Sequence, residues 1–203
     1  MLYLHHRERQ TKVLGPGTRY AIWVQGCNRR CSGCINPEGQ PIDKNGYWID
    51  EQEVLAEIKA TSGLRGVTIS GGEPFLQAEA LGKIVDDLKG TTNLDVMIYT
   101  GYTLSELKKE GGDFARKLIN NTDILVDGEY IKELNNNYIY RGSDNQKIHI
   151  LTNRYKKFKD YFNNTKNRDI EFVCRDTGEL FMIGIPQNDF REEFWREVIN
   201  KTK

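Results

Sequence analysis

Short runs of β-branched and aromatic residues alternate along the chain with segments in which apolar residues recur every three or four positions. The first pattern predicts strands, and the second predicts helices with one buried face. Their alternation is typical of βα units that build a parallel sheet, so we expect an α/β fold. The predicted strands are Arg19–Val24, Gly66–Ser70, Leu94–Thr100, Ile124–Val126, Tyr138–Tyr140 and Lys147–Leu151.

Helical patterns fill the gaps between these strands. Two of them begin at a capping-box pattern, Asp50 with Glu53 and Thr103 with Glu106, in which a capping residue is followed three positions later by Glu. The helices are predicted over 50–60, 76–89 and 103–120, the last with a Gly-Gly break before Asp113.

The pattern changes towards the carboxyl terminus, where a polar helical stretch, a β-hairpin and a final amphipathic helix from about Asn188 are predicted. The hairpin rests on two β-rich runs, Asp169–Cys174 and Glu179–Ile185, on either side of an Asp-Thr-Gly turn. We therefore divide the chain into a main unit at 1–152 and a small α+β extension at 153–203. The extension is either an appendix or a layer of the same domain.

Composition and charge narrow the classes of function. The 203 residues suit one domain, and no stretch approaches the roughly 20 apolar residues that cross a bilayer. The amino terminus has no apolar signal core, so we expect a cytoplasmic protein without a membrane partner. Lys plus Arg equals Asp plus Glu at 29 each, which gives no basic excess for nucleic acid. The basic stretch Arg154–Arg168 is interpreted as a solvated helix face, because most such runs are, with a local binding patch as the alternative.

Three of the four cysteines, Cys27, Cys31 and Cys34, lie within eight residues in the spacing CxxxCxxC. Disulfides between residues three or four apart are awkward, so a metal or redox role is predicted. Structural zinc sites and electron-carrying cubanes usually take four protein ligands. Three thiolates around a [4Fe-4S] cluster leave one iron open, and an open iron can bind the amino and carboxylate groups of a substrate.

Two other interpretations concern the same residue types. A zinc site could be completed by His5, His6 or His149, and this alternative stays open from the spacing alone. The fourth cysteine, Cys174, lies far away in the apolar run EFVC, and we expect it to be a buried structural residue.

The segment Ser70-Gly71-Gly72-Glu73-Pro74 follows the second predicted strand, at the end where open α/β sheets bind ligands. Adjacent glycines let the backbone approach a ligand closely, and Glu73 offers a carboxylate to an ammonium group. The alternative is an ordinary strand-to-helix turn with Glu73 in the first helical turn.

Together, CxxxCxxC and the downstream GGEP resemble the radical S-adenosylmethionine superfamily. The resemblance implies that Cys27, Cys31 and Cys34 hold a [4Fe-4S] cluster and that S-adenosyl-L-methionine chelates its open iron. It also implies that the segment from Ser70 to Glu73, with Gly71 and Gly72, contacts the amino group of this cofactor and that Ile35 touches its adenine.

Further segments resemble one branch, the activating proteins of anaerobic (class III) ribonucleotide reductase, over about residues 10–150. These segments are Gly15–Arg19, Val24–Cys27, Gly33–Glu38, Tyr99–Tyr102, Leu125–Gly128 and Arg141–Gln146. Polar residues at the ends of successive strands, Thr100, Asp127, Arg141 and Asn145, are accordingly candidates for cofactor contacts. Arg141 could equally cap a helix or pair with Asp127.

This branch implies a partial (βα)6 barrel, open on one side. Its members cleave S-adenosylmethionine to a 5′-deoxyadenosyl radical that removes an α-hydrogen from a glycine of a glycyl radical enzyme. A low-potential donor of the flavodoxin or ferredoxin type supplies the electron. The long extension leaves a second interpretation, a radical enzyme that modifies another protein, peptide or small molecule. A third is a zinc-bound interaction module without catalysis.

Overall fold

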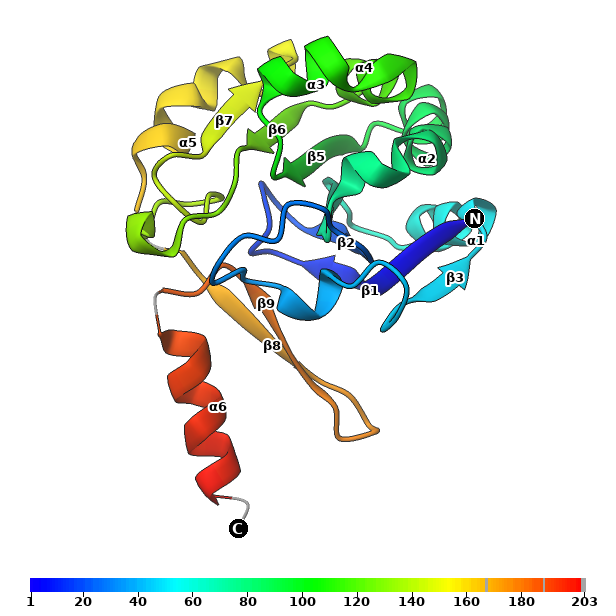
Figure 1. Cartoon of the computed structure of the whole chain (residues 1–203). Helices are drawn as coiled ribbons and strands as arrows, with labels where there is room; N and C mark the ends of the chain where they lie inside the picture. The colour runs from blue at the N-terminus through cyan, green and yellow to red at the C-terminus, as the bar shows by residue number, and fades with distance from the viewer. Residues whose placement is uncertain (167, 188, 202–203) are drawn as a thin grey trace.

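The computed structural model describes residues 1–166, 168–187 and 189–201, and a seven-stranded sheet forms its centre (Figure 1). The strands lie in the order β3-β1-β2-β4-β5-β6-β7. Neighbours from β2 to β6 are parallel, whereas β1 and β3 on one side and β7 on the other pair antiparallel. The sheet strands are β1 Leu2–Thr11, β2 Arg19–Val24, β3 Tyr47–Ile49, β4 Gly66–Gly71, β5 Asp95–Thr100, β6 Ile124–Asp127 and β7 Lys147–Ile150.

Four helices cover one face of the sheet, which we call the outer face (Figure 1). Strand residues on this face, such as Ile22, Ile69 and Ile98, are fully buried against helix residues such as Leu81 and Leu118. The helices are α1 Glu51–Ala60, α2 Ala78–Thr91, α3 Leu104–Glu110 and α4 Gly112–Asn120, with short 3₁₀ turns η1 Pro37–Gly39, η2 Pro74–Gln77 and η3 Lys132–Leu134.

The opposite, inner face is covered by the carboxyl-terminal quarter of the chain. Over β5 and β6, Met97 and Val126 pack with Tyr155 and Phe162. Over β2, Ala21 packs with residues of the carboxyl-terminal hairpin. These carboxyl-terminal elements are η4 Asn153–Phe158, α5 Lys159–Asn164, the hairpin β8 Ile170–Cys174 and β9 Leu180–Gly184, and α6 Phe190–Lys201, which extends away from the sheet (Figure 1).

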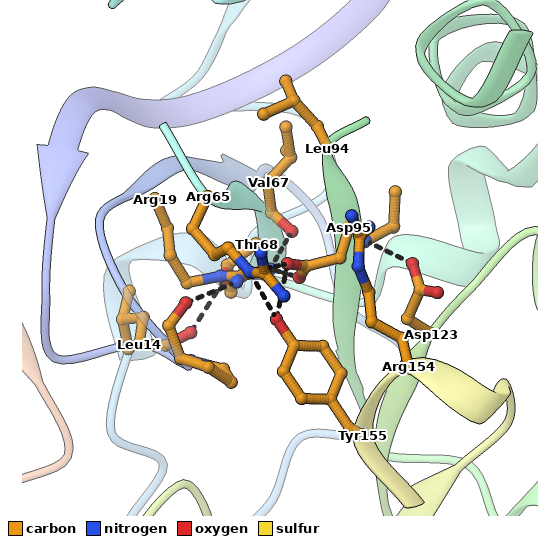
Figure 2. A network of polar contacts seen from close by, with 12 residues as sticks. Leu14, Arg19, Arg65, Val67, Thr68, Leu94, Asp95, Asp123, Arg154 and Tyr155 are labelled. Carbon is orange, nitrogen blue, oxygen red and sulfur yellow. Dashed lines mark hydrogen bonds and ion pairs between the residues drawn. The ribbon is translucent and has the colours of Figure 1, made fainter. Parts of the chain in front are cut away.

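A buried ion pair ties the amino-terminal ends of the parallel strands together (Figure 2). Arg19 on β2 donates to Asp95 Oδ1 on β5 at 2.6 Å and to Thr68 Oγ1 on β4 at 2.6 Å, and both charged side chains are fully buried. The other oxygen of Asp95 accepts from Tyr155 Oη at 2.7 Å, and Tyr155 Oη also accepts from Arg65 Nε at 3.1 Å. This network joins three strands to η4 at the end of the sheet opposite the cysteines.

Most predicted elements are confirmed, including the parallel centre and the hairpin. Thr103 and Glu106 form the predicted capping box, whereas Asp50 caps α1 through the backbone N–H of Gln52. The helix predicted from about Asn188 is present as α6, and Asn188 itself lies outside the described residues. Among the described residues, every helix is too short or too polar to span a bilayer.

The strand predicted at Tyr138–Tyr140 is wrong. Tyr138 makes only an isolated bridge with Lys166, and positive φ values at Asn137 (65°) and Tyr140 (59°) interrupt the extended conformation that a strand requires. Two strands were not predicted, the long β1 and the short β3.

Candidate active site

One cavity lies at the carboxyl ends of the parallel strands, and all three clustered cysteines border it. Cys27 is buried, whereas Cys31 and Cys34 are half-buried, and none forms a disulfide. Burial raises the pKa of the thiols of Cys31 and Cys34. Iron bound by these cysteines would displace the thiol protons, because the thiolate is the metal ligand.

The loop that carries the cysteines is closed at its base by backbone hydrogen bonds. Gly26 N–H donates to Gly39 O at 2.8 Å, and Cys27 N–H donates to Gln40 O at 2.9 Å. Gln25, which is 2% exposed, braces the same base by donating from Nε2 to Pro41 O at 2.7 Å. The protein alone therefore fixes where the thiols emerge.

Backbone hydrogen bonds join the Gly71-Gly72-Glu73 segment directly to this loop. Gly72 N–H donates to Val24 O at 2.7 Å, and Glu73 N–H donates to Gly26 O at 2.8 Å. A Cβ on Gly72 would overlap Gly26 O, and Gly71 has a φ of +106°, so this approach requires glycine at both positions. Ser70, Gly71, Gly72 and Glu73 all line the cavity with the cysteines, as does Ile35.

Glu73 is 1% exposed, and both of its carboxylate oxygens accept hydrogen bonds. Oε1 accepts from Phe75 N–H at 3.0 Å and from Thr100 Oγ1 at 2.8 Å, and Oε2 accepts from Gly101 N–H at 2.8 Å. Burial nevertheless raises its pKa to about 7. Glu73 lies in the turn after β4, as the N-cap of η2 and not in a first helical turn, and the same side chain lines the cavity together with Thr100.

The histidines proposed for a zinc site lie elsewhere. His5 and His6 line a different cavity on β1, where His6 stacks on Phe181, and His149 Nε2 lies 2.9 Å from Asp127 Oδ2. Within the described part of the chain, no three His, Cys, Asp or Glu side chains converge tightly enough to hold a single metal ion. The three thiols all border the cavity at the carboxyl ends of the parallel strands.

Several buried hydrogen-bond donors at the cavity have no partner in the described part of the chain. They are Asn36 Nδ2, Arg29 Nε and Tyr99 Oη. Buried donors are normally satisfied, so orphaned donors at a cavity indicate a polar ligand or water. The cavity therefore fits an iron-sulfur cluster with a polar organic molecule beside it. It offers three thiols, hydrogen-bond donors without a partner, and space beside Gly71 and Gly72, which have no side chains.

Residues 13–149 match the family model described as a 4Fe-4S single cluster domain. The anaerobic ribonucleoside-triphosphate reductase-activating protein of Vibrio cholerae serotype O1 is 36% identical over 147 residues, which cover 69% of this chain and 92% of that protein. The chain belongs to the radical S-adenosylmethionine activating enzymes. The protein of the same name from Escherichia coli K12 is 31% identical, covering 68% and 92%. The pyruvate formate-lyase-activating enzyme of Staphylococcus aureus USA300 is 33% identical, covering 78% and 63%.

As a radical S-adenosylmethionine activating enzyme, the protein uses a [4Fe-4S] cluster and S-adenosylmethionine. The family match includes the cysteine loop and the Gly-Gly-Glu segment, which the structure brings together at one cavity. The sequence predicted this juxtaposition.

Three predicted cofactor residues of this activating enzyme do not line the cavity. Asp127 accepts from Leu104 N–H at 2.6 Å, and Asn145 donates to Glu129 O at 2.7 Å. Arg141 donates to Gln146 O at 3.3 Å, lies 3.4 Å from Asp144 and stacks over a tyrosine ring, so it does not form the ion pair with Asp127 that we considered. Cofactor contact by these three residues stays a prediction.

Residues adjacent to them in the sequence border the cavity instead. Gly128, Gly142 and Gln146 line it, and Gln146 holds the loop by donating to Gly128 O at 2.8 Å and by accepting from Gly142 N–H at 2.7 Å. The sequence signal for Gln146 is its place in the Arg141–Gln146 segment. Sequence reasoning found no signal for two other lining residues, Gly184 and Ile185.

The prediction for Cys174 is wrong, because its side chain is exposed. It lies at the end of β8, opposite Leu180 in a two-stranded hairpin. An apolar run in such a hairpin buries alternate residues at most, and Cys174 occupies an outward position.

Proposed function

We propose that this activating enzyme installs a glycyl radical on an anaerobic ribonucleotide reductase. The observation that carries the proposal is that relatives named for activating this reductase are covered over 92% of their own length. The alignment with this chain therefore includes almost the whole length of those relatives. The matched residues 13–149 include the complete cysteine loop.

In this proposal Cys27, Cys31 and Cys34 would hold the cluster and leave one iron open for S-adenosylmethionine. When bound, the cluster would supply the single electron that cleaves S-adenosylmethionine to methionine and a 5′-deoxyadenosyl radical, and this radical would take a glycine α-hydrogen of the client to give 5′-deoxyadenosine and the glycyl radical. Glu73, held by Thr100 and Gly101, orients the cofactor's amino group together with Ser70, Gly71 and Gly72. Ile35 contacts the adenine.

The remaining predicted residues act through the loops that they hold. Asp127 and Asn145 fix the segments around Gly128, and Arg141 fixes Gln146, so these side chains position backbone that borders the cofactor. The finer fold in the proposal is a partial (βα)6 barrel. The parallel strands β2, β4, β5 and β6, with helices on their outer face, support it.

The electron comes from a low-potential donor of the flavodoxin or ferredoxin type, because the sulfonium accepts an electron only from a strongly reducing cluster. We further propose the cytoplasm as the compartment, since its reducing medium keeps three unpaired thiols available for iron.

The test is anaerobic reconstitution with iron and sulfide, followed by incubation with S-adenosylmethionine, a chemical reductant and a candidate anaerobic ribonucleotide reductase. We expect 5′-deoxyadenosine by chromatography and a glycyl radical signal by electron paramagnetic resonance. A reductase whose radical-site glycine is replaced by alanine, and the Cys31→Ala activating enzyme, serve as controls without signal. Formation of 5′-deoxyadenosine without any glycyl signal would exclude this client while leaving the cleavage reaction intact.

A formate-lyase type of glycyl radical enzyme is the second candidate client. The Staphylococcus aureus relative aligns with 78% of this chain, a larger share than the 69% of the Vibrio cholerae relative. The same assay with both clients at equal concentration decides between them by the size of the glycyl signal.

A further inference from the structure

Two residues from the carboxyl-terminal hairpin border the cavity that holds the cysteines. Gly184 is the last residue of β9, and Ile185, which is 7% exposed, follows it. Both lie beyond residue 149, where the family match ends. The cavity therefore has one wall that the matched part of the chain does not supply.

This wall is fixed to the strands on one side of the cavity. Glu171 on β8 accepts from Thr11 Oγ1 at 2.6 Å and from Lys12 N–H at 3.0 Å. Ile183 packs with Leu14 and Ala21 on the inner face, and Ile183 is 2% exposed. The hairpin thus covers the inner face of β2 directly below the cysteine loop.

The same segment is fixed on the opposite side of the cavity. Pro186 O accepts from Asn135 Nδ2 at 3.2 Å, and Arg168 donates to Arg141 O at 3.1 Å. The Lys132 ammonium lies 2.9 Å from Asp189 Oδ1. The described residues 168–187 and Asp189 therefore lie between β1–β2 on one side and the loop 131–142 on the other.

Gly184 and Ile185, the two residues of this wall that border the cavity, carry no charge and no polar side-chain group. Ile185 shares the cavity with Leu14 and Trp23, which belong to the same apolar cluster as the hairpin residue Ile183. The thiols and the unpaired donors lie on the cysteine loop and at the strand ends. A cofactor with amino, carboxylate and ribose groups matches the polar side. The apolar side is left for the second reactant, which in the proposed function is a polypeptide segment centred on glycine.

We propose that the hairpin forms the client-facing wall of the active site and that Ile185 limits the size of the residues beside the target glycine. This inference rests on the proposed function, because it concerns the client of the same cavity. In an apolar pocket, the fit of a few methylene groups changes the discrimination between substrates by about tenfold or more.

The first experiment measures glycyl radical formed per 5′-deoxyadenosine released, with the reductase as client. Ile185→Trp should lower this ratio by about tenfold or more, because the indole fills the space for the client. Ile185→Val should keep the wild-type ratio. Met182→Trp is the matched control: its cross-strand neighbour Phe172 stacks on Phe194, so it faces away from the sheet. A wild-type ratio in Ile185→Trp, or an equal loss in Met182→Trp, would overturn the proposal.

The second experiment needs no client. In the metal-free protein, Ile185→Ala should raise the rate at which a bulky maleimide labels Cys27, Cys31 and Cys34 by about threefold or more, since thiol reactivity follows access. Met182→Ala should leave the rate unchanged, and mass spectrometry after digestion assigns the labelled thiols. If the wild-type enzyme forms no glycyl radical on any client, the proposed function fails, and the labelling experiment alone tests whether the hairpin forms a wall of the cavity. A raised labelling rate in Ile185→Ala supports that wall, and an unchanged rate refutes it.

Discussion

At the scale of single residues, Glu73 combines a structural and a chemical task. Its carboxylate accepts three hydrogen bonds from η2 and the end of β5, yet it is almost completely buried. Removal from water outweighs those bonds and raises its pKa to about 7 from an ordinary 4.5. The ligand-free site therefore holds a carboxyl group that is ready to lose a proton when an ammonium group arrives.

This pKa predicts how the stability of the metal-free protein depends on pH. The folded protein binds the proton more tightly than the unfolded chain, so the stabilisation is complete below pH 4.5 and is lost as pH rises through about 7. The free energy of unfolding should fall by up to ~3 kcal/mol over this window from Glu73 alone. Glu73→Gln should remove that part of the fall in urea titrations across the window, and Glu79→Gln on the surface of α2 should not. Parallel pH curves for wild type and Glu73→Gln would contradict the prediction.

At the scale of elements, the cysteine loop and the Gly-Gly-Glu segment can approach each other because Gly72 has no side chain. Gly72→Ala puts a methyl group against Gly26 O and should destabilise the protein by about 1–3 kcal/mol, as overpacking usually does. It should also lower the iron content after reconstitution. Gly82→Ala in α2 is the matched control, because a Cβ there meets nothing within 4 Å. We expect Gly82→Ala to stabilise the protein by about 0.5–1 kcal/mol in thermal melts. Equal melting of both variants would show that the loop tolerates displacement.

The buried Arg19–Asp95 pair makes a second prediction at this scale. Asp95→Ala leaves the Arg19 guanidinium buried without its counter-charge and should cost about 3–5 kcal/mol in urea unfolding. Asp113→Ala, which removes an exposed carboxylate from α4, should change stability by less than about 0.5 kcal/mol. A small loss for Asp95→Ala would mean that water enters the network shown in Figure 2.

The elements also show what sequence patterns can and cannot predict. The central strands are predictable because parallel strands buried on both faces appear as continuous apolar runs, as in Val96 to Ile98. Strand β1 escapes detection because its middle, His5 to Gln10, is polar and partly exposed. The Tyr138–Tyr140 run was misread because propensity favours a strand, whereas the backbone turns at Tyr140.

At the scale of the whole molecule, the carboxyl-terminal quarter of the chain fills the inner face of the sheet. Tyr155, Phe162, Ile183 and Ile185 are each at most 7% exposed. Burial of four such side chains stabilises a protein by about 6–12 kcal/mol, which is comparable to the whole stability of a domain. Deletion of residues 153–203 should therefore give a chain that binds the dye ANS and loses its cooperative thermal transition. A truncated protein that melts cooperatively near the wild-type temperature would contradict this.

The active-site residues that can be predicted from the sequence are those that belong to local motifs. The cysteine spacing and the Gly-Gly-Glu segment each lie within a few residues, so their chemistry is visible before folding. Gly184 and Ile185 reach the same cavity from a distant part of the chain through tertiary packing. No local pattern marks such residues, because each has the appearance of an ordinary apolar position.

The closed base of the cysteine loop has a consequence for the life of the enzyme in air. Gly26 and Cys27 are joined to Gly39 and Gln40 by backbone hydrogen bonds that do not involve the cluster. Loss of the iron and sulfide should therefore leave the base of the loop in place. A molecule stripped by oxygen then remains a ready acceptor for fresh iron and sulfide, provided its thiols are reduced. Repair of the cluster should then require only iron, sulfide and reduced thiols, and no newly synthesised protein.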